Sequence, residues 1–283
     1  MNKKVGIVIS VIVAAAVIFF LAVIILNQNS SKKDEKNNNT EQIENNSNQN
    51  DSVNTENKNI ENIVLNSKIG MEIQNTIYIP NLYSDKFFKE IEASGLKDRA
   101  KIMFTFAKIV SDDSYLSIIR KSESYAGDYV TKDDLENVAK KLFTDTSNLK
   151  HQEVFLSGSY DSKEGNYIIL PTGFVEFNYI KDIPYKIEEV GDNITVYTYR
   201  LYVNCNTIET MEENTNSTHT IYYDDTKKNK ALVINDEKMD DENTQNEFLN
   251  SKISSGEISK DKMKKGVYKI QRKGNSYLIE DIK

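Results

Sequence analysis

The sequence has a single cysteine, only two histidines and no tryptophan. With Cys205 alone no internal disulfide can form, so the folded part must be held together by its apolar core. A zinc site needs several His or Cys ligands at short spacings, and too few are present. The chain also has no Gly-x-Ser-x-Gly nucleophile elbow and no nucleotide-binding motif. We therefore expect no catalytic residue, no metal site and no cofactor.

An excess of basic residues is also lacking. The chain has 36 Lys and Arg against 43 Asp and Glu, a net charge of −7. Acidic and basic residues balance within residues 1–60, so the negative charge belongs to residues 61–283. Because nucleic-acid binding relies on a basic face that neutralises phosphates, we expect no nucleic-acid partner.

The longest apolar run is Val5–Leu26, which follows Lys3 and Lys4 and precedes the next charge at Lys32. As a helix it would span about 33 Å, enough for the hydrocarbon core of a bilayer. We predict a single-pass transmembrane signal anchor, with residues 1–4 as a cytoplasmic tail and the bulk of the chain extracellular. Such a tail is too short for an output domain, which disfavours a sensor kinase or an anti-sigma factor.

A cleaved signal peptide is the alternative to an anchor. Secretory apolar regions run about 7 to 15 residues and end at a small-residue cleavage site in a polar context. Here the small residues Ala14, Ala15 and Ala16 lie in the middle of the apolar run, so cleavage beside them would have to occur inside the membrane. Lipid anchoring is disfavoured, because no cysteine follows the run before Cys205.

Residues 27–60 are predicted to be a disordered linker. Of these 34 residues 12 are Asn, and only Ile43, Val53 and Ile60 are apolar. Such a segment buries too little apolar surface to offset its ordering entropy. Its r.m.s. reach would be about 30 Å. It is either a spacer through the inner cell wall or compositional drift without a selected length.

Residues 61–283 are predicted to be one extracytoplasmic α+β domain, and its first part has helical periodicity. We expect a helix capped by Ser84 and closed by Gly95, and a second from Leu96 that is interrupted and recapped at 111–113. A third begins at Thr131, with Asp134 in a capping pattern. Their apolar faces include Phe87, Phe88, Ile91, Ala100, Met103, Ala107, Leu135, Val138, Ala139, Leu142 and Phe143.

After Lys150 the apolar period changes to two, which predicts strands. The expected strands are 152–156, 167–170, 174–180, 185–190, 194–205, 218–223, 231–234, 267–271 and 277–282. Short turns at Gly165, Gly191, 227–230 and Gly274 favour an antiparallel β-meander. A polar stretch, 237–265, interrupts it before the last hairpin, with short helices expected around Phe248 and Met263.

Few side chains are candidates for chemistry. Cys205 falls on the more apolar, odd-numbered face of its strand, so we expect it to pack in the core. The alternatives are a nucleophile or an intermolecular disulfide. His151 and Glu153 would share one side of a strand, as two metal ligands, as a base and its orienting acid, or in a surface or capping role. His151 and His219 are both expected near strand starts. Ser157-Gly158-Ser159 is expected to be a loop.

Acidic doublets recur, and we expect most of them at caps and turns. Neighbours on a strand point to opposite faces and so do not converge on one substrate. The best calcium candidate is the stretch 240–247, which lacks the central Gly of an EF-hand loop. The groups are Asp112-Asp113, Asp133-Asp134, Glu188-Glu189, Glu212-Glu213, Asp224-Asp225 and the triplet Asp240-Asp241-Glu242.

Tyrosine is abundant, with 16 residues. Tyr197 and Tyr199 alternate with Tyr202 on the opposite face of a strand. A sheet lined by tyrosine could bind glycan or peptide through a flat amphipathic surface. The competing interpretation is an AT-rich genome and the fit of tyrosine to half-buried strands.

Two resemblances follow from longer motifs. Asn81-Leu82-Tyr83-Ser84, the stretch from Tyr129 to Phe143, and Tyr167-Ile168-Ile169-Leu170-Pro171-Thr172-Gly173 resemble uncharacterised single-pass extracytoplasmic proteins of low-GC Gram-positive bacteria. That group implies no activity. The closing hairpin, 267–270 with 277–282, resembles the end of NTF2-like domains, which implies helices packed on a curved antiparallel sheet.

We expect a membrane-anchored, non-enzymatic binding or structural module of the cell envelope. Its partners would be the membrane, through Val5–Leu26, and another membrane or cell-wall protein. The alternative is a cell-envelope hydrolase that uses carboxylates, which needs two acids in one pocket.

The anchor predicts that the mature protein keeps its N-terminus in the membrane fraction. Mass spectrometry of protein purified from membranes should find peptides that begin within the first few residues. A mature N-terminus within 27–31 would contradict the anchor and favour a cleaved leader.

Overall fold

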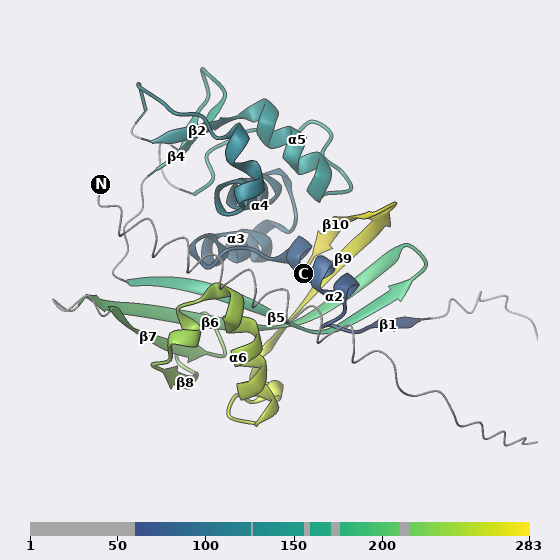
Figure 1. Cartoon of the computed structure of the whole chain (residues 1–283), viewed down its shortest axis with the longest axis vertical. Coiled ribbons are helices and arrows are strands. Elements are labelled where there is room, and N and C mark those ends of the chain that lie inside the picture. The colour runs from purple at the N-terminus through teal and green to yellow at the C-terminus, as the bar shows by residue number, and fades with distance from the viewer. Residues whose placement is uncertain (1–59, 126, 156–158, 171–175, 210–214) are drawn as a thin grey trace, which may run out of the picture. The chain divides into compact units, whose positions relative to one another are not determined.

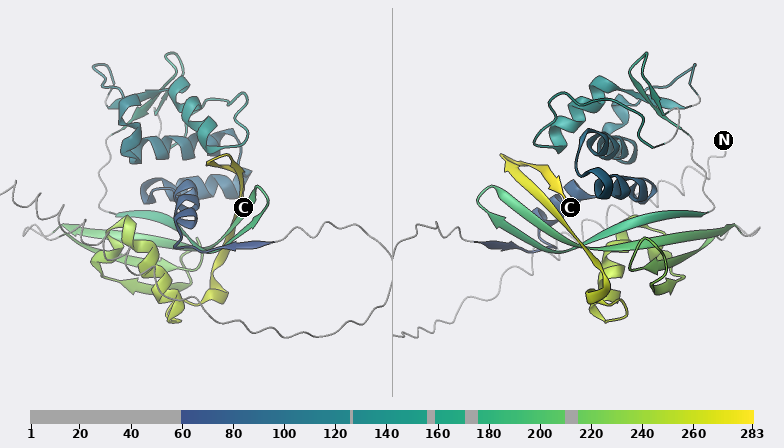
Figure 2. Two further views of the ribbon diagram at one scale, coloured as in Figure 1. Left: turned by 45° about the vertical axis from the view of Figure 1, so that its right-hand side comes forward. Right: turned by 180° about the vertical axis from the view of Figure 1, so that it is seen from behind.

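A long twisted antiparallel sheet separates two unequal helical layers (Figures 1 and 2). This computed structural model describes residues 60–283 except 126, 156–158, 171–175 and 210–214, and these belong to one unit of the chain. The predicted anchor and all of the linker before Ile60 lie outside the described residues. Within the described part, none of the helices has the length and apolar character needed to cross a membrane. The described fold is α+β with antiparallel sheets, as predicted.

The elements follow one another along the chain as helices first and long strands after. The helices are α2 (Lys68–Ile77), α3 (Asn81–Ser94), α4 (Asp98–Ser111), α5 (Lys132–Leu142) and α6 (Glu242–Ser254), with 3-10 turns at Asp113–Ile118, Glu237–Met239 and Lys260–Lys262. The strands are β1 (Glu61–Ile63), β2 (Asp128–Thr131), β3 (Tyr160–Asp161), β4 (Asn166–Ile169), β5 (Glu176–Val190), β6 (Asn193–Glu209), β7 (Thr215–Tyr222), β8 (Lys230–Ile234), β9 (Lys264–Lys273) and β10 (Ser276–Ile282).

Strand β6 organises the main sheet. It pairs with β5 along nearly its whole length, while its other edge pairs with β9 over 193–200 and with β7 over 202–209. Strands β5 to β8 are consecutive neighbours, which is the predicted meander. The β9–β10 hairpin instead returns to the first half of β6, an arrangement that the sequence did not predict. Strands β2, β4 and β3 form a separate small sheet.

The larger core lies between the sheet and α2 to α5. Helix α3 packs on β5, α4 packs on α3, and α5 packs on α4 and β10 (Figure 2). Aromatic rings join these layers: Phe87 contacts Phe88 and Phe104, and Phe104 contacts Phe143. The smaller core lies on the opposite sheet face, under α6, and contains Leu201, Val203, Cys205, Ile221, Leu249 and Ile253.

The predicted helices are present with shifted boundaries. Helix α5 begins as expected, because the Thr131 side chain accepts a bond from the Asp134 backbone N–H. Asp112 recaps the chain after α4. Ser84 is not an N-cap: α3 begins at Asn81 after Pro80, and the buried Ser84 hydroxyl accepts a bond from the Ile180 N–H of β5. Helix α2 was not predicted.

Two strand predictions were wrong. Residues 151–155 form no strand. Arg99 of α4 donates hydrogen bonds to the carbonyl oxygens of Glu153 and Val154, which holds this segment against the helices instead of in a sheet. The two strands expected at 174–180 and 185–190 are one strand, β5, which passes Pro184 at a β-bulge. Phe174 lies outside the described residues.

The prediction for the faces of β6 was wrong in its first half. Over 194–200 the even-numbered side chains are buried against the helices, and the odd-numbered ones are half-exposed. Only from Leu201 onward does the odd face enter a core, where α6 covers it. Each face of β6 is therefore buried along a different part of the strand. An alternating pattern in the sequence does not show which face is covered at a given position.

The Thr131 cap should contribute measurably to stability. We expect Thr131→Ala to lower the free energy of unfolding by about 1 kcal/mol, since it leaves an N–H of α5 without its side-chain acceptor. Urea denaturation measures this loss. Ser259→Ala is the matched control, because Ser259 precedes a 3-10 turn without a side-chain cap bond. Equal effects of the two substitutions would contradict the capping role.

Candidate functional site

A buried ion pair lies at the centre of the sheet. Asp182 of β5 and Arg200 of β6 are direct partners in the strand register. Arg200 donates to both carboxylate oxygens of Asp182, at 2.7 Å from Nε and 2.9 Å from Nη2. The side chains are 1% (Arg200) and 6% (Asp182) exposed, and the guanidinium stacks on the Phe88 ring of α3, 4.3 Å from its centroid. This is the bidentate geometry that a buried pair requires.

Further donors complete the coordination of Asp182. The Tyr268 hydroxyl donates to Oδ2 at 2.9 Å, and the Thr198 hydroxyl donates to the same oxygen at 3.2 Å. Gly266 of β9 allows this crowding, because a Cβ there would lie 2.5 Å from Thr198 Oγ1 and 3.0 Å from Asp182 Oδ2. Burial and the Asp182 charge raise the pKa of Tyr268, so the phenol remains a donor.

Glu92 of α3 links the pair to solvent. Its Oε1 lies 3.5 Å from Arg200 Nη1, and it also accepts bonds from Lys264 and Tyr202. Burial alone would raise the pKa of Glu92, but the Lys264 bond and the charges of Lys264 and Arg200 hold it below its usual value. The cluster thus joins α3, β5, β6 and β9.

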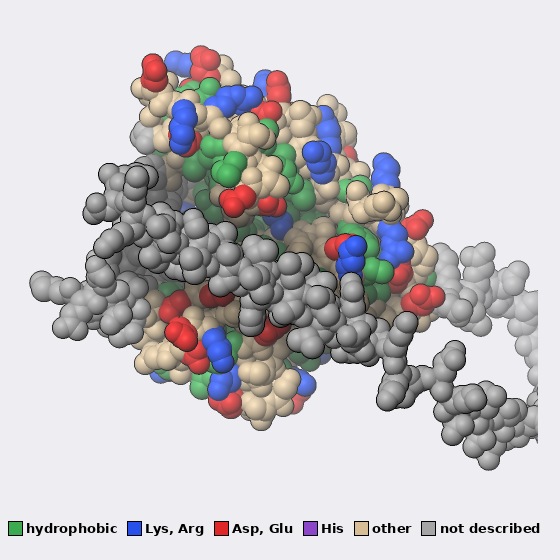
Figure 3. All heavy atoms as spheres, in the orientation of Figure 1, with side chains coloured by type: hydrophobic (Ala, Val, Ile, Leu, Met, Phe, Trp, Pro, Cys, Tyr) green, Lys and Arg blue, Asp and Glu red, His purple; other side chains and the backbone are tan. Residues whose placement is uncertain are grey.

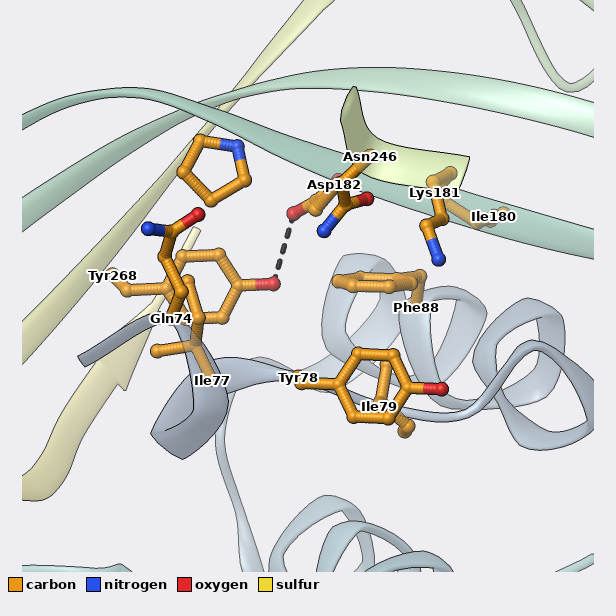
Figure 4. A pocket seen from close by; sticks show the side chains of 11 residues that line it. Gln74, Ile77, Tyr78, Ile79, Phe88, Ile180, Lys181, Asp182, Asn246 and Tyr268 are labelled. Carbon is orange, nitrogen blue, oxygen red and sulfur yellow. Dashed lines mark hydrogen bonds between the residues drawn. The ribbon is translucent and has the colours of Figure 1, made fainter. Parts of the chain in front are cut away.

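A small cavity borders this cluster (Figure 4). It measures about 30 Å³ and lies among α2, α3, β5, β9 and α6. Asp182 and Tyr268 form part of its wall, and Lys181 and Asn246 line it as well. The remaining lining residues are Gln74, Ile77, Tyr78, Ile79, Phe88, Ile180 and Pro184.

The two histidines form similar bonds, with a tyrosine on Nδ1 and an acid on Nε2. For His151 the partners are Tyr167 at 3.0 Å and Glu136 at 2.8 Å. For His219 they are Tyr179 and Asp240, both at 3.0 Å. Because both ring nitrogens are engaged, neither imidazole offers an open ligand position.

The other sequence candidates do not converge. His151 and Glu153 do not share a strand face, since Glu153 instead accepts bonds from the N–H and hydroxyl of Ser159. Ser157 and Gly158 lie outside the described residues. His219 is within β7, not near its start, and is buried. Cys205 is buried opposite His219, as predicted for a core residue.

The acidic doublets mostly serve local structure. Asp112 caps a 3-10 turn, Asp134 pairs with Arg120, and Asp224 accepts bonds within its turn. Glu212 and Glu213 lie outside the described residues. In the calcium candidate, Asp240 binds His219 and Glu242 accepts bonds from Tyr78 and Asn81. Over the described residues, no group of three or more His, Cys, Asp or Glu side chains could hold a metal ion.

A row of tyrosines lies on the part of the sheet face beyond α6. Tyr185 stacks on Tyr199 with ring centroids 4.1 Å apart and an interplanar angle of 19°, and Tyr197 lies 6.2 Å from Tyr185. We call these three half-exposed residues the tyrosine platform. Glu188 and Lys186 lie at the edge of the platform. Glu188 accepts a hydrogen bond from the Tyr197 hydroxyl at 2.7 Å and forms an ion pair with Lys186.

The charges around the platform are set by these contacts. The bond to Glu188 raises the pKa of Tyr197, and the bond from Lys186 lowers the pKa of Glu188. At neutral pH the edge therefore carries a carboxylate, an ammonium group and a phenol. On the face in Figure 3, charges of both signs are interspersed over the described surface.

Sequence reasoning missed the Asp182–Arg200 pair, Lys181 and helix α2. A charged residue within an alternating strand is normally assigned to the solvent face. The one available signal was Gly266, directly before the strand predicted at 267–271. A glycine within a strand is typical of close backbone approach, and β9 includes Gly266. The tyrosine platform was anticipated in part, through Tyr197 and Tyr199.

No family model, curated protein or solved structure matches the chain. The two resemblances given above therefore stay predictions.

Lys181 should cost stability at neutral pH. Burial lowers the pKa of Lys181 to about 8, whereas the unfolded chain holds the proton up to about 10.4. The loss of folding free energy caused by burying this ammonium group is therefore complete below pH 8, and it decreases as the pH rises towards 10. We expect Lys181→Met to raise the free energy of unfolding by about 1 to 3 kcal/mol at pH 7.

Urea denaturation at pH 7 and pH 10 measures this gain. Lys186→Met, on the exposed side of the same strand, is the control and should change stability by less than about 0.5 kcal/mol. A Lys181→Met protein that is less stable, or whose gain is the same at both pH values, would contradict the cost of a buried ammonium.

Proposed function

We propose that the chain is a single-pass membrane protein, anchored by Val5–Leu26, whose extracellular domain is a non-enzymatic binding module of the cell envelope. The tyrosine platform is its binding surface, and glycan strands of the cell wall are its ligand. The stacked Tyr185 and Tyr199 rings with Tyr197 beside them are the observation that carries this proposal.

The chemistry of the platform suits sugars. Flat phenol rings offer apolar faces with polar edges, which match a sugar ring that has C–H groups on its faces and hydroxyls around it. Glu188 accepts and Lys186 donates hydrogen bonds at the edge. Lys269, bonded to Thr195, adds a donor on the neighbouring strand. Because the sheet is rigid, little ordering entropy is lost on binding.

The hydrolase alternative has weaker support. A general acid needs a raised pKa. Among the described carboxylates with a resolved shift, only Glu242 has its pKa raised, through burial. Its oxygens are occupied by the Tyr78 hydroxyl and the Asn81 N–H. The described contacts place no second acid beside it, so Glu242 fits a structural role in holding α6.

A wall-binding assay tests the proposal. Detergent-solubilised full-length protein is incubated with purified cell-wall sacculi, and the bound fraction is measured by sedimentation. We expect Tyr185→Ser combined with Tyr197→Ser to weaken binding about tenfold, since two aromatic contacts contribute about 0.5 to 1.5 kcal/mol each.

Tyr129→Ser is the matched control. Tyr129 is a half-exposed tyrosine on the small sheet, paired with Tyr125 away from the platform. It should leave binding unchanged. If the wild-type protein does not sediment with sacculi, or if the control weakens binding as much as the platform variant, the proposal is wrong.

A further inference from the structure

Lys181 is a buried ammonium group for which the described part of the chain supplies no counter-ion. It lies on β5, is 3% exposed, and its Nζ has no hydrogen-bond partner and no ion pair among the described residues. Its ammonium group lies over the Tyr78 ring, 5.5 Å from the ring centroid. A buried charge in this condition destabilises a fold. Such a residue suggests a site that is completed by a ligand.

The lysine lines the cavity next to the Asp182–Arg200 pair (Figure 4). One water molecule needs about 10 to 15 Å³ of such space, so about 30 Å³ admits two or three non-hydrogen atoms. Asn246 of α6 directs its amide nitrogen into the same cavity, as Figure 4 shows. Two hydrogen-bond donors from different elements thus approach one small space.

The acids nearby are already neutralised or bound. Asp182 accepts bonds from Arg200, Tyr268 and Thr198. Glu242 accepts a hydrogen bond from the Tyr78 hydroxyl. The titratable groups in the cavity wall besides Lys181 are Asp182, Tyr268 and Tyr78. Arg200 is bonded to Asp182, Glu242 is bonded to Tyr78, and Lys108 lies over the Tyr78 ring. None of the carboxylates in this group forms an ion pair with Lys181.

We propose that Lys181 and Asn246 form a binding site for the carboxylate group of a small aliphatic acid. A carboxylate has three non-hydrogen atoms, which matches the cavity, and its charge supplies the missing counter-ion. A phosphate group, with five, is too large. Because the carboxylate alone fills this volume, the aliphatic part of the acid extends out through the opening of the cavity. Gln74 and Asn246 are half-exposed and mark the side on which the cavity meets solvent.

This site does not depend on the proposed function. It lies between α2, α3, β5, β9 and α6, whereas the tyrosine platform lies on the open sheet face. A carboxylate site could serve a wall-binding module or any other activity of the domain. The two proposals can therefore fail separately.

Thermal unfolding of the full-length protein in detergent tests the site, with sodium acetate as the probe and sodium chloride at equal ionic strength as the reference. At about tenfold excess over Kd, acetate should raise the Tm of the wild-type protein by about 3 to 6 °C. Lys181→Met should abolish this shift, and Lys186→Met should retain it. Because Lys181→Met is expected to be more stable than the wild type, loss of the shift cannot be attributed to unfolding.

Two further measurements separate the site from general salt effects. Raising the pH from 7 to 9.5 should reduce the acetate shift, as Lys181 loses its charge. Burial also lowers the pKa of Lys108 to about 8, so the pH series is repeated in Lys108→Met, which should behave as the wild type. Inorganic phosphate should give no shift.

Three results would overturn the proposal. The first is an acetate-induced rise in Tm that persists in Lys181→Met, and the second is a rise with phosphate as large as that with acetate. The third is the absence of any rise with acetate, together with the absence of a saturation-transfer NMR signal from acetate. The last result would mean that the cavity holds water only. The Tyr185→Ser and Tyr197→Ser variant should keep the acetate response, whatever its binding to sacculi.

Discussion

The buried ion pair between Asp182 and Arg200 is the constraint on which the rest of the structure depends. Removing both charges from water costs several kcal/mol per ion, and only close, fully bonded geometry offsets that cost. Asp182 and Arg200 must therefore stay opposite each other in the β5–β6 register, with Phe88 over the guanidinium and Tyr268 against the carboxylate. One interaction thus sets the relative positions of α3, β5, β6 and β9.

The two candidate surfaces lie on either side of this pair. Lys181 precedes Asp182 on β5 and lines the small cavity among the helices. The platform tyrosines lie just beyond, where β5 passes its bulge and β6 leaves the cover of α6. Because β5 and β6 are fixed to each other along nearly their whole length, both surfaces are rigid. Such preorganisation favours binding. It is accompanied by a loss of stability from Lys181, which forms no ion pair with a described residue.

Local chemistry could be predicted from the sequence, and long-range pairing could not. Thr131 with Asp134 marked the start of α5, and Gly165, Gly191 and Gly274 marked hairpin turns where the structure has positive φ. The return of β9 to β6 has no local signal, because it depends on which edge of β6 is free. Arg200 was missed for the same reason: its partner is 18 residues away, and alternation alone cannot show that both faces of β6 are covered.

A double-mutant cycle on the ion pair tests this account most directly. We measure the free energy of unfolding for Asp182→Leu, Arg200→Met and the double variant by urea denaturation. Each single substitution should cost about 3 to 5 kcal/mol, since it leaves one buried charge without its partner. The double variant should cost far less than the sum of the two. Additive losses would show that the two side chains act independently, and would contradict the central role given to the pair.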